Sequence, residues 1–561
     1  MEIPEVFEFQ GRTRLVFGND MLKEVGRLAK RLGMRKPLVV ADNVMAKNGT
    51  AARIEEKVRE AGLDCAGVFT DIPPNSDVVI VSRGYDAITK SAGDSLIAVG
   101  GGSTLDTAKG IGIMIVCGGK LREGVGVLDR PMPPLIAIPT TAGTGSEVTS
   151  AAVIKDYKRK QKLGFQSYHL SPDMAILDPV VTASMPPVLT ASTAMDALTH
   201  AVESLCSLSG NPVSEGLALH AIRMITENVV EAARNGGNLK ARGAMLLAST
   251  IAGLAFSNSM VGCVHAMAHA CGGAFDVPHG IANAILLPYG MEYNMDAAAD
   301  RCAEAARAMG IDTTQMDDRG AALAAISAVR RLTKELGLPQ SLREAGIPED
   351  GVPKVAEDAM LDGTMFTNPR TANLAEIKQV LMKAFRGEEP AAAVPMAEKK
   401  AQPAQKAQPA EKPAQKPQPA ETAPFVEPEE VYRVSEKFTK RLFADPTLAQ
   451  KLKESGLVIQ FRYYDERWGE GVETIITVDP RGGEISVTTG DTDVEPAVVM
   501  RMHSETAHLF WTQKLNLMAA LNSGKISVTG PVQEAMKLMP YIKSGFNLDK
   551  EPVREFAAER G

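Results

Sequence analysis

One carboxylate and four imidazoles are concentrated in a short, otherwise apolar stretch of this chain. Asp196 and His200 lie four residues apart in MDALTHAVE, and His265 and His269 repeat that spacing in VHAMAHA. Both segments have helical composition, and residues four apart on a helix share one face. His279 follows in VPHG. An aspartate with the three neutral imidazoles of His200, His265 and His279 makes a nitrogen and oxygen site for a divalent first-row metal.

The alternative is a set of buried histidines that are hydrogen-bonded in a helical core. The chain has eight His, four of them in this stretch, and any one alone would favour that alternative. Two spaced pairs and a further His together favour the metal site. Cys263 and Cys271 flank His265, so thiolate ligation is a further alternative, although imidazole and carboxylate already complete a site.

A glycine-rich turn could place a phosphate group near this metal. Residues 95–99 (SLIAV) have the composition of a buried strand, and GGGSTLDTAKG, from Gly100 to Gly110, opens a predicted helix directly after it. Glycines let the backbone approach a ligand, and a helix N-terminus presents N–H groups and a positive dipole to phosphate. The segment is not the G-x-G-x-x-G fingerprint, and many strand–helix turns carry glycine for geometry alone.

A second turn of similar character strengthens that prediction. The segment IPTTAGTGSEVT supplies hydroxyl groups and glycines that allow tight turns; the hydroxyls belong to Thr140, Thr141, Thr144 and Ser146. Upstream, the apolar run PLVVAD ends at Asp42. A carboxylate at a strand end can accept a hydrogen bond from an adenosine ribose and repel a 2′-phosphate, which predicts NAD rather than NADP. The alternative role for Asp42 is a helix N-cap.

These segments carry a family resemblance. The run through GGGST, PTTAGTGSE, MDALTHAVE, GCVHAMAHACGG and FDVPHGIANAILLPY resembles the iron-dependent (group III) alcohol dehydrogenases over roughly residues 5–385. The resemblance implies a dehydroquinate synthase-like fold, in which an α/β nucleotide-binding domain joins an all-helical metal domain and the active site lies between them. It also implies NAD(H) and iron as cofactors and a homodimer or larger homo-oligomer.

The resemblance assigns roles to individual residues. It implies that Asp196, His200, His265 and His279 are the metal ligands and that His269 is a nearby non-ligand histidine. It implies nucleotide contacts at Gly101, Gly102, Ser103, Asp106, Thr140 and Thr141, and further contacts at Asn75 and Lys162. All four ligand positions are intact, which argues against the metal-free maleylacetate reductase branch.

Composition bounds the remaining possibilities. A chain of 561 residues is too long for one domain, and 45% apolar residues suffice for real cores. A net charge of −7 without a basic cluster makes nucleic acid an unexpected partner. Six scattered Cys without a C-x-x-C pair suit a reducing cytoplasm. No signal pattern opens the chain, and no apolar stretch is expected to span a bilayer.

Four segments are expected along the chain. Residues 1–183 alternate strand-like and helical runs, as in a mainly parallel sheet, and residues 184–386 have helical periodicity. Residues 387–424 repeat Ala, Gln, Pro and Lys with almost no large apolar residue, which predicts a disordered, semi-extended tether. Residues 425–561 have the helix, antiparallel sheet and helix pattern of an α+β domain.

The last segment has its own resemblance. RMHSETAHLFWTQKLNLMAALNSGKISVTGPVQEAMKLMP resembles the sterol-carrier-protein type 2 domain, which implies a lipid or fatty-acyl tunnel beneath the sheet. Methionines and large apolar residues suit such a pocket; the candidates are Phe510, Trp511, Leu515, Met518, Met536 and Met539. The alternative is that these side chains simply form the core.

The predicted chemistry is metal-assisted hydride transfer between an alcohol or aldehyde and NAD(H). His269 is the candidate catalytic proton relay, or else it supports a ligand. The Irving–Williams order would favour Zn²⁺, but the four-residue ligand set of the family favours Fe²⁺. Met185, Phe256, Met260, Phe275 and Phe366 could line an apolar substrate pocket.

Three functions therefore stay open. The first is an alcohol dehydrogenase for medium or long hydrophobic substrates that the tethered lipid-type domain presents. The second is a lipid-binding or assembly protein with a vestigial dehydrogenase. The third is a hydroxyacid–oxoacid transhydrogenase on the same fold, for which no arginine pair marks a carboxylate pocket.

Overall fold

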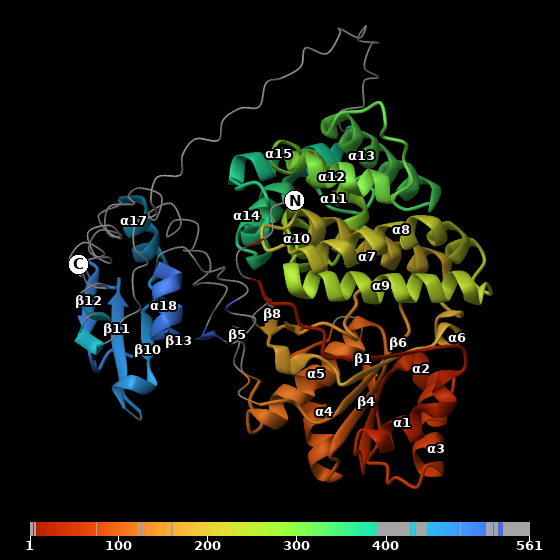
Figure 1. Ribbon diagram of the computed structural model, residues 1–561, viewed down its shortest axis with the longest axis horizontal. Coiled ribbons are helices and arrows are strands. Elements are labelled where there is room, and N and C mark those ends of the chain that lie inside the picture. Colours follow the sequence, from red (N-terminus) through yellow and green to blue (C-terminus); the bar gives the residue numbers. More distant parts are fainter. Residues whose placement is uncertain are drawn as a thin grey trace, which may run out of the picture.

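A computed structural model gives the structure of the chain. It describes all residues except 1–3, 5–6, 74–75, 122–123, 126–127, 129, 159–160, 390–426, 430, 433–445, 470, 483, 512–519, 521–524 and 531–561. Of the predicted tether, residues 387–424, all but the first three residues thus lie outside the described residues. Three bodies follow one another in Figure 1: an α/β part, a helical part and a C-terminal part with its own sheet.

The α/β part is built on a six-stranded sheet in which all paired strands are parallel. The strand order is β1 (Arg14–Phe17), β9 (Met174–Leu177), β6 (Leu135–Pro139), β4 (Ser95–Gly100), β2 (Pro37–Asp42) and β3 (Gly67–Ile72). The central strands β4 and β6 are buried along their whole length. Continuous apolar runs such as SLIAV form such strands because helices cover both faces of the sheet.

Helices on the two faces bury separate apolar clusters. One cluster lies with α4 (Val78–Lys90) and α5 (Gly102–Val116), and the other with α1 (Val25–Arg31) and α3 (Thr50–Glu60). The strands turn into helices at one edge of the sheet: β2 leads into α2 (Asn43–Lys47), and β4 leads into α5. Ligands of open α/β sheets bind at this edge.

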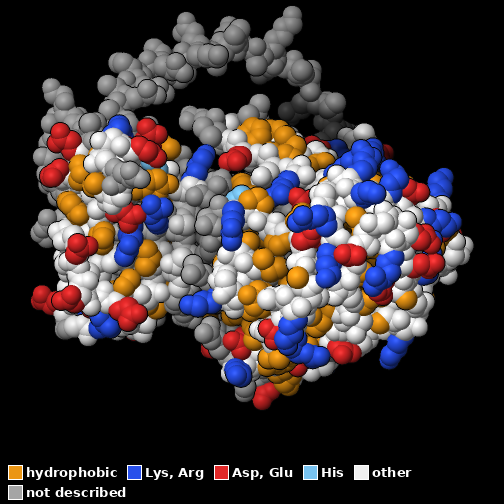
Figure 2. Space-filling model, turned by 90° about the horizontal axis from the view of Figure 1, so that it is seen from below, with side chains coloured by type: hydrophobic (Ala, Val, Ile, Leu, Met, Phe, Trp, Pro, Cys, Tyr) orange, Lys and Arg blue, Asp and Glu red, His pale blue; other side chains and the backbone are white. Residues whose placement is uncertain are grey.

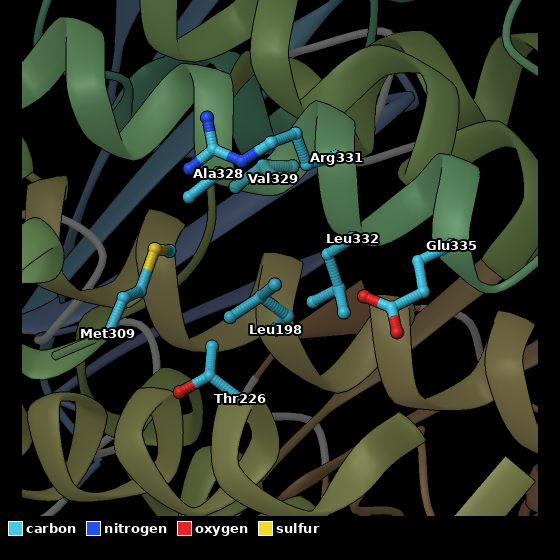
Figure 3. A pocket seen from close by; sticks show the side chains of 8 residues that line it. All are labelled: Leu198, Thr226, Met309, Ala328, Val329, Arg331, Leu332 and Glu335. Atoms are coloured by element: carbon cyan, nitrogen blue, oxygen red, sulfur yellow. The ribbon is translucent and has the colours of Figure 1, made fainter. Parts of the chain in front are cut away.

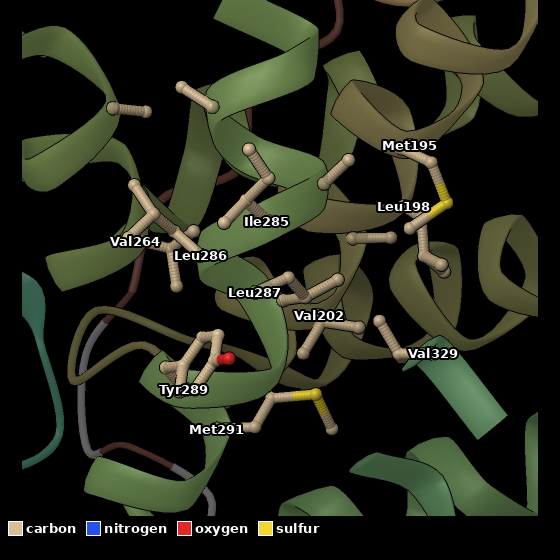
Figure 4. Packing of buried hydrophobic residues seen from close by; sticks show 14 of the residues in the cluster. Met195, Leu198, Val202, Val264, Ile285, Leu286, Leu287, Tyr289, Met291 and Val329 are labelled. Carbon is tan, nitrogen blue, oxygen red and sulfur yellow. The ribbon is translucent and has the colours of Figure 1, made fainter. Parts of the chain in front are cut away.

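The helical part packs around α7 (Pro187–Cys206), of which all but the first turn is largely buried. Its other long helices are α8 (Pro212–Arg234), α9 (Leu239–Ser259), α10 (Cys263–Phe275), α11 (His279–Tyr293), α12 (Met295–Ala308), α13 (Asp318–Glu335), α14 (Val352–Met360) and α15 (Leu374–Arg386). Figure 4 shows how side chains from α7, α10 and α11 interlock, among them Leu198, Val264 and Leu287. Alanine-rich faces let these helices approach closely.

One helix in the described part of the chain, α9, is long and apolar enough to cross a membrane by length and composition. Within its most apolar stretch of 18 residues, 61% is buried inside the protein, as in the core helix of a compact domain. The expectation that no apolar stretch reaches this length is therefore wrong for α9 by length and composition, although Arg242 lies within the helix.

The C-terminal sheet continues into the α/β part. Its strands β12 (Ser486–Thr489), β11 (Glu473–Asp479), β10 (Ile459–Tyr464), β13 (Val498–His503) and β14 (Ile526–Thr529) are followed in the same sheet by β5 (Gly124–Val125), β8 (Gln161–Gln166) and β7 (Ala151–Asp156). The described helices of this part are α17 (Pro446–Ser455) and α18 (Ser504–Trp511). Figure 1 shows β5 between the two bodies.

Candidate active site

Three helices bring three of the predicted metal ligands together. Asp196 lies on α7, His265 on α10, and His279 is the first residue of α11, directly after Pro278. Their ligand atoms all lie within 4.8 Å of one another. Asp196 Oδ1 is 3.4 Å from His279 Nε2. His265 and His279 follow Asp196 by 69 and 83 residues in the sequence. The three side chains converge because α7, α10 and α11 pack around one core.

His200 lies beside this trio, one turn along α7. Its ring stacks on His265 with 4.6 Å between centroids and on Phe256 with 4.2 Å. Burial lowers the pKa of His200 to about 4, although Asp196 opposes this effect. The ring is therefore neutral at pH 7, which is the protonation state of a metal ligand. Its Nδ1 is buried without a hydrogen-bond partner.

Glu203 orients His265 and was missed by the sequence analysis. Its Oε2 accepts from His265 Nδ1 at 2.5 Å, and its two oxygens also accept from the backbone N–H groups of Val264 and His265. Burial would lower the pKa of His265, but the hydrogen bond and charge of Glu203 outweigh it and raise that pKa. With Nδ1 held in this way, Nε2 faces the cluster, the arrangement common among metal-binding histidines. Glu203 completes the HAVE segment, seven residues after Asp196 on the same face of α7.

Asn283 is a second residue that the sequence analysis missed. Its Nδ2 donates to Asp196 Oδ1 at 2.6 Å and lies 3.2 Å from His279 Nε2 and 3.4 Å from His265 Nε2. It lies four residues after His279 on α11, so the i, i+4 rule that paired the histidines could have found it. The amide keeps the carboxylate and the two imidazoles turned toward one point.

His269 has a carboxylate partner of its own. Its Nδ1 lies 2.8 Å from Oδ2 of Asp362, which comes from the loop before η4 (Gly363–Thr367). Burial would raise the pKa of Asp362, but the facing His269 and hydrogen bonds from Thr364 hold it well below its usual range. The His269 ring also stacks on His279 with 5.1 Å between centroids and is partly exposed. An oriented, solvent-accessible imidazole beside the cluster is geometrically suited to proton transfer.

The predicted nucleotide turns face each other across the sheet edge. Thr140 N–H donates to the carbonyl of Gly100 at 3.0 Å. A Cβ added at Gly102 would lie 2.7 Å from Thr144, and one at Gly101 would lie 3.3 Å from Thr141. Glycine is therefore required at Gly102 for the two turns to touch, and the N-terminus of α5, including Ser103, opens beside the threonine hydroxyls.

Asp42 caps a helix and also faces the glycine-rich turn. Its Oδ1 accepts from the N–H groups of Val44 and Met45 at the start of α2. Its Oδ2 lies over Gly100, where an added Cβ would come within 2.8 Å. The N-cap alternative is thus correct for one oxygen, while the other oxygen stays directed at the turn where a ribose is expected.

A buried polar network holds the second turn in place. Asp106 accepts from Ser146 Oγ at 2.6 Å and from Val153 N–H at 3.0 Å. Lys109 donates to Thr149 and to the carbonyl of Ala151, and Glu147 accepts from Thr250 on α9. Burial lowers the pKa of Lys109 to about 8, with Asp106 and Glu147 opposing it. Both oxygens of Asp106 and the hydroxyl of Ser146 are engaged within the protein, so their predicted contact with nucleotide is through the turn that they hold.

Several predicted residues fall outside the described part of the chain. Asn75 is not described, and Lys162 is placed only as a backbone position in β8, opposite Lys155 of β7. Among the lipid-pocket candidates, Phe510 and Trp511 belong to α18 without described side chains, and Leu515, Met518, Met536 and Met539 lie outside the described residues. These assignments remain predictions.

A cavity of about 190 Å³ lies elsewhere in the helical part. Leu198, Val329, Leu332 and Met309 line it together with Arg331 and Glu335 (Figure 3). Leu198 is two residues from Asp196 and so points away from the ligand face of α7. The cavity carries no group for redox chemistry and is separate from the cluster.

A second cluster of metal-ligand residue types occurs in the C-terminal part. Asp465, Glu466 and His503 also have ligand atoms within 4.8 Å of one another. Here Arg467 donates to both oxygens of Asp465, and Ser504 donates to one of them. His503 Nε2 lies 3.1 Å from Glu466, and its Nδ1 accepts from the Glu505 N–H. The acceptor atoms of Asp465 and Nδ1 of His503 are therefore already occupied by hydrogen bonds within the protein.

The first cluster fits a divalent cation. It offers one carboxylate and three imidazoles, one of which is buried with an unpartnered nitrogen, and Asn283 Oδ1 is likewise buried without a partner. The second turn lies against α7 near this cluster, because a Cβ added at Gly143 would lie 2.7 Å from Thr193, three residues before Asp196. A cation site beside phosphate-type turns indicates a metal-dependent, nucleotide-linked oxidoreductase.

Sequence comparison identifies the class more closely. The family described as "Iron-containing alcohol dehydrogenase" matches residues 12–179, and "Fe-containing alcohol dehydrogenase family, C-terminal" matches residues 190–385. The "SCP-2 sterol transfer family" matches residues 436–543. The chain belongs to the iron-containing alcohol dehydrogenases and carries an SCP2-like domain at its C-terminal end. The predicted fold class is confirmed.

Relatives agree with this assignment. The 1,3-propanediol dehydrogenase of Citrobacter freundii is 42% identical over 66% of this chain and 96% of its own length. The NAD-dependent methanol dehydrogenase of Bacillus methanolicus is 37% identical over 66% of this chain and 97% of its own length. A 1,3-propanediol oxidoreductase structure is 40% identical, with a TM-score of 0.66, and covers 68% of this chain and 100% of its own. The protein is therefore an NAD-linked dehydrogenase of alcohols, and these relatives align with about two thirds of the chain.

Proposed function

We propose that the protein is an iron-dependent NAD(H)-linked alcohol dehydrogenase and aldehyde reductase that acts on medium or long hydrophobic substrates. The observation that carries the proposal is the convergence of Asp196, His265 and His279, with His200 stacked beside them. Asp196, His200, His265 and His279 would hold Fe²⁺. When bound, the cation supplies a Lewis acid that lowers the pKa of the substrate hydroxyl.

The chain supplies orientation and a proton path. Glu203 and Asn283 keep the ligand atoms turned to one point. The facing turns at Gly100–Ser103 and Thr140–Ser146 are proposed to bind the pyrophosphate, with Asp42 Oδ2 on the adenosine ribose and Asn75 and Lys162 as further contacts. The nicotinamide supplies the redox chemistry. His269, held by Asp362, is proposed to pass the proton to solvent.

Substrate length distinguishes this proposal from its alternatives. The experiment is NADH oxidation under anoxic conditions with added Fe²⁺, across aldehydes of increasing chain length and with an oxoacid as a separate substrate. Rising kcat/KM with chain length supports the proposal. A preference for the oxoacid would instead support a transhydrogenase, and a metal-free chain that retains acyl lipid without binding NADH would support a lipid-binding protein.

Metal identity and assembly need separate measurements. Apoenzyme reloaded with Fe²⁺ is expected to be more active than apoenzyme reloaded with Zn²⁺, and equal activity would contradict iron. We also propose a cytoplasmic homodimer or larger homo-oligomer, which light scattering coupled to size exclusion tests directly.

A further inference from the structure

The C-terminal domain is joined to the dehydrogenase through a shared sheet edge. β14 pairs antiparallel with β5, placing Val528 opposite Val125 and Thr529 opposite Gly124. On its other side β5 pairs parallel with β8 of the dehydrogenase. Figures 1 and 2 show the C-terminal body alongside the dehydrogenase body, and Figure 1 labels β5 between them. Strand addition of this kind uses main-chain hydrogen bonds for affinity and side chains for specificity.

Two dehydrogenase side chains extend the apolar core of the C-terminal domain. Met260 and Phe366 pack against the cluster that includes Phe461, Met502 and Ile526. Gln166, at the end of β8, donates to Met260 Sδ at 3.4 Å. At the periphery, Lys525 lies 3.9 Å from Glu8. We refer to β5, Met260 and Phe366 as the seat.

Met260 and Phe366, the two side-chain anchors of the seat, belong to segments that hold catalytic groups. Met260 joins α9 to α10, five residues before His265, and its φ of 65° is a left-handed conformation that methionine rarely adopts. Phe366 lies in η4, whose first turn is capped by Asp362 Oδ1 while Oδ2 of the same carboxylate holds His269. The two segments are linked, because Thr367 Oγ1 donates to the carbonyl of Val261 at 2.5 Å.

The same segments are hydrogen-bonded to the start of α10 and lie close to Glu203. Asn368 Oδ1 accepts from the Cys263 N–H at 3.1 Å, and Glu203 accepts from Val264 and His265. A Cβ at Gly262 would lie 2.8 Å from Asn368 Oδ1 and 3.1 Å from Glu203. The linked segments therefore transmit displacement of either anchor to the residues that orient His265 and His269, since packed units shift rather than deform continuously.

We propose that the seat is the docking surface of this chain's own C-terminal domain and that docking positions the His269–Asp362 pair for turnover. Met260 and Phe366 are positioning residues in this proposal. The carrier-type domain then has a second role besides presenting substrate: it keeps the anchor segments ordered, and hydride transfer is fast only when it is seated. The proposal rests on the proposed function, because it concerns the same active site.

The test uses the full chain with variants on both sides of the seat. Phe366→Ala removes an anchor, and Phe366→Leu is its conservative partner. Lys525→Glu places like charge opposite Glu8 without changing the dehydrogenase, and Glu8→Lys with Lys525→Glu restores the pair. Glu484→Lys is the matched control, because it reverses an exposed charge near β12, an edge strand that β11, β10 and β13 separate from β14.

Hydrogen exchange reports docking independently of activity. Phe366→Ala and Lys525→Glu are expected to lose amide protection in β5 and β14 while β10 stays protected. With ethanol or butanol, kcat is expected to fall about tenfold or more in Phe366→Ala, because small misplacements of catalytic groups are costly. The fall is about two- to fivefold in Lys525→Glu, since an exposed ion pair contributes little. KM for these short alcohols is expected to stay the same.

Recovery in Phe366→Leu and in the charge-swapped double variant, with Glu484→Lys unchanged, would support the proposal. Loss of β5 and β14 protection with unchanged kcat would overturn the positioning role. Unchanged protection in both undocking variants would overturn the seat. Failure of the proposed function is distinguishable, because the parent chain would then lack bound metal and NADH binding whatever its exchange pattern. If Phe366→Ala fails to fold, the hydrogen exchange and kcat of Lys525→Glu and of the charge-swapped double variant test the proposal.

Discussion

Two regions of this protein each bring three residues of metal-binding types within the same distance of one another, yet only one has the hydrogen bonding expected of a metal site. Asp196, His265 and His279 in the helical part, and Asp465, Glu466 and His503 in the C-terminal part, each bring their ligand atoms within 4.8 Å. In the first, Glu203 holds Nδ1 of His265 and leaves Nε2 directed at the cluster. In the second, Arg467, Ser504 and the Glu505 N–H use the acceptor atoms of Asp465 and His503.

Proximity of ligand residues is therefore weaker evidence for a metal site than the hydrogen bonds that their donor and acceptor atoms already make. A metal-binding histidine is oriented by a partner on the nitrogen that does not bind the metal, as Glu203 holds Nδ1 of His265. A carboxylate held by a guanidinium is already satisfied, and the hydrogen bond from Arg467 keeps the pKa of Asp465 well below its usual range. The first cluster is expected to bind a cation, and the second to stabilise the C-terminal fold.

The largest effect is expected from removing a ligand of the first cluster. His265→Ala should abolish metal binding and lower kcat/KM by about 1000-fold, since Lewis-acid stabilisation contributes several kcal/mol. His503→Ala is the counterpart in the second cluster and should leave metal content unchanged. Metal analysis after dialysis, together with turnover of a short alcohol, checks both. Equal metal loss in the two variants would contradict the distinction between the clusters.

The next effect concerns the residue that orients His265. Glu203→Gln should weaken metal affinity about 10- to 100-fold at pH 8, as loss of such supporting contacts typically does. Glu203 raises the pKa of His265, so protons compete with the metal as pH falls through that raised value. The metal affinity of the variant should therefore begin to fall at a lower pH than that of the parent, although its affinity at pH 8 is weaker. Competition titrations with a chromophoric chelator at several pH values measure both quantities.

The metal-free protein should show the opposite pH trend. A raised pKa in the folded state means that the His265–Glu203 pair stabilises the apoprotein fully below the unfolded pKa of His. This stabilisation is lost as pH rises through the folded value. Glu203→Gln should thus destabilise the apoprotein more at pH 5.5 than at pH 8.5, which denaturant unfolding resolves. A difference of constant size across pH would show that the pair carries no charge.

Much of the catalytic region could be predicted from the sequence, because its signals are local. The i, i+4 pairs and the glycine-rich turn lie within single helices or turns, where spacing fixes geometry. The pairing of Asp362 with His269 could not be predicted, because 93 residues separate them and only the packing of η4 on α10 joins them. Asp42 shows a middle case: its N-cap role is local, whereas the approach of Oδ2 to Gly100 depends on neighbouring strands.

The C-terminal part illustrates the limit of such predictions. Alternation of apolar and polar residues predicts its strands, since each needs only one buried face. Its pairing with β5 could not be predicted, because a two-residue strand has almost no sequence signal. Edge pairing depends on main-chain groups that every residue carries.

A smaller, purely structural effect is expected in the second cluster. Asp465→Asn should destabilise the C-terminal domain by about 1–3 kcal/mol, because Arg467 and Ser504 lose a charged acceptor. Metal stoichiometry should stay at that of the parent. Denaturant unfolding monitored at Trp468, together with metal analysis, separates the two outcomes. A lower metal content would mean that Asp465 is a ligand after all.

The smallest effect tests whether the second cluster can be converted. Arg467→Ala removes the guanidinium from Asp465, although Ser504 and the backbone N–H of residue 467 still donate to that carboxylate. In addition, Nδ1 of His503 accepts from the Glu505 N–H, so the neutral ring carries its proton on Nε2, the nitrogen that faces Glu466. A cation could use Nε2 only if that proton moved to Nδ1 and broke the backbone bond. Calorimetric titration of the variant with Mn²⁺ or Zn²⁺ should therefore show no gain in tight binding, and a new micromolar site would mean that carboxylates alone suffice and that the tautomer does not decide.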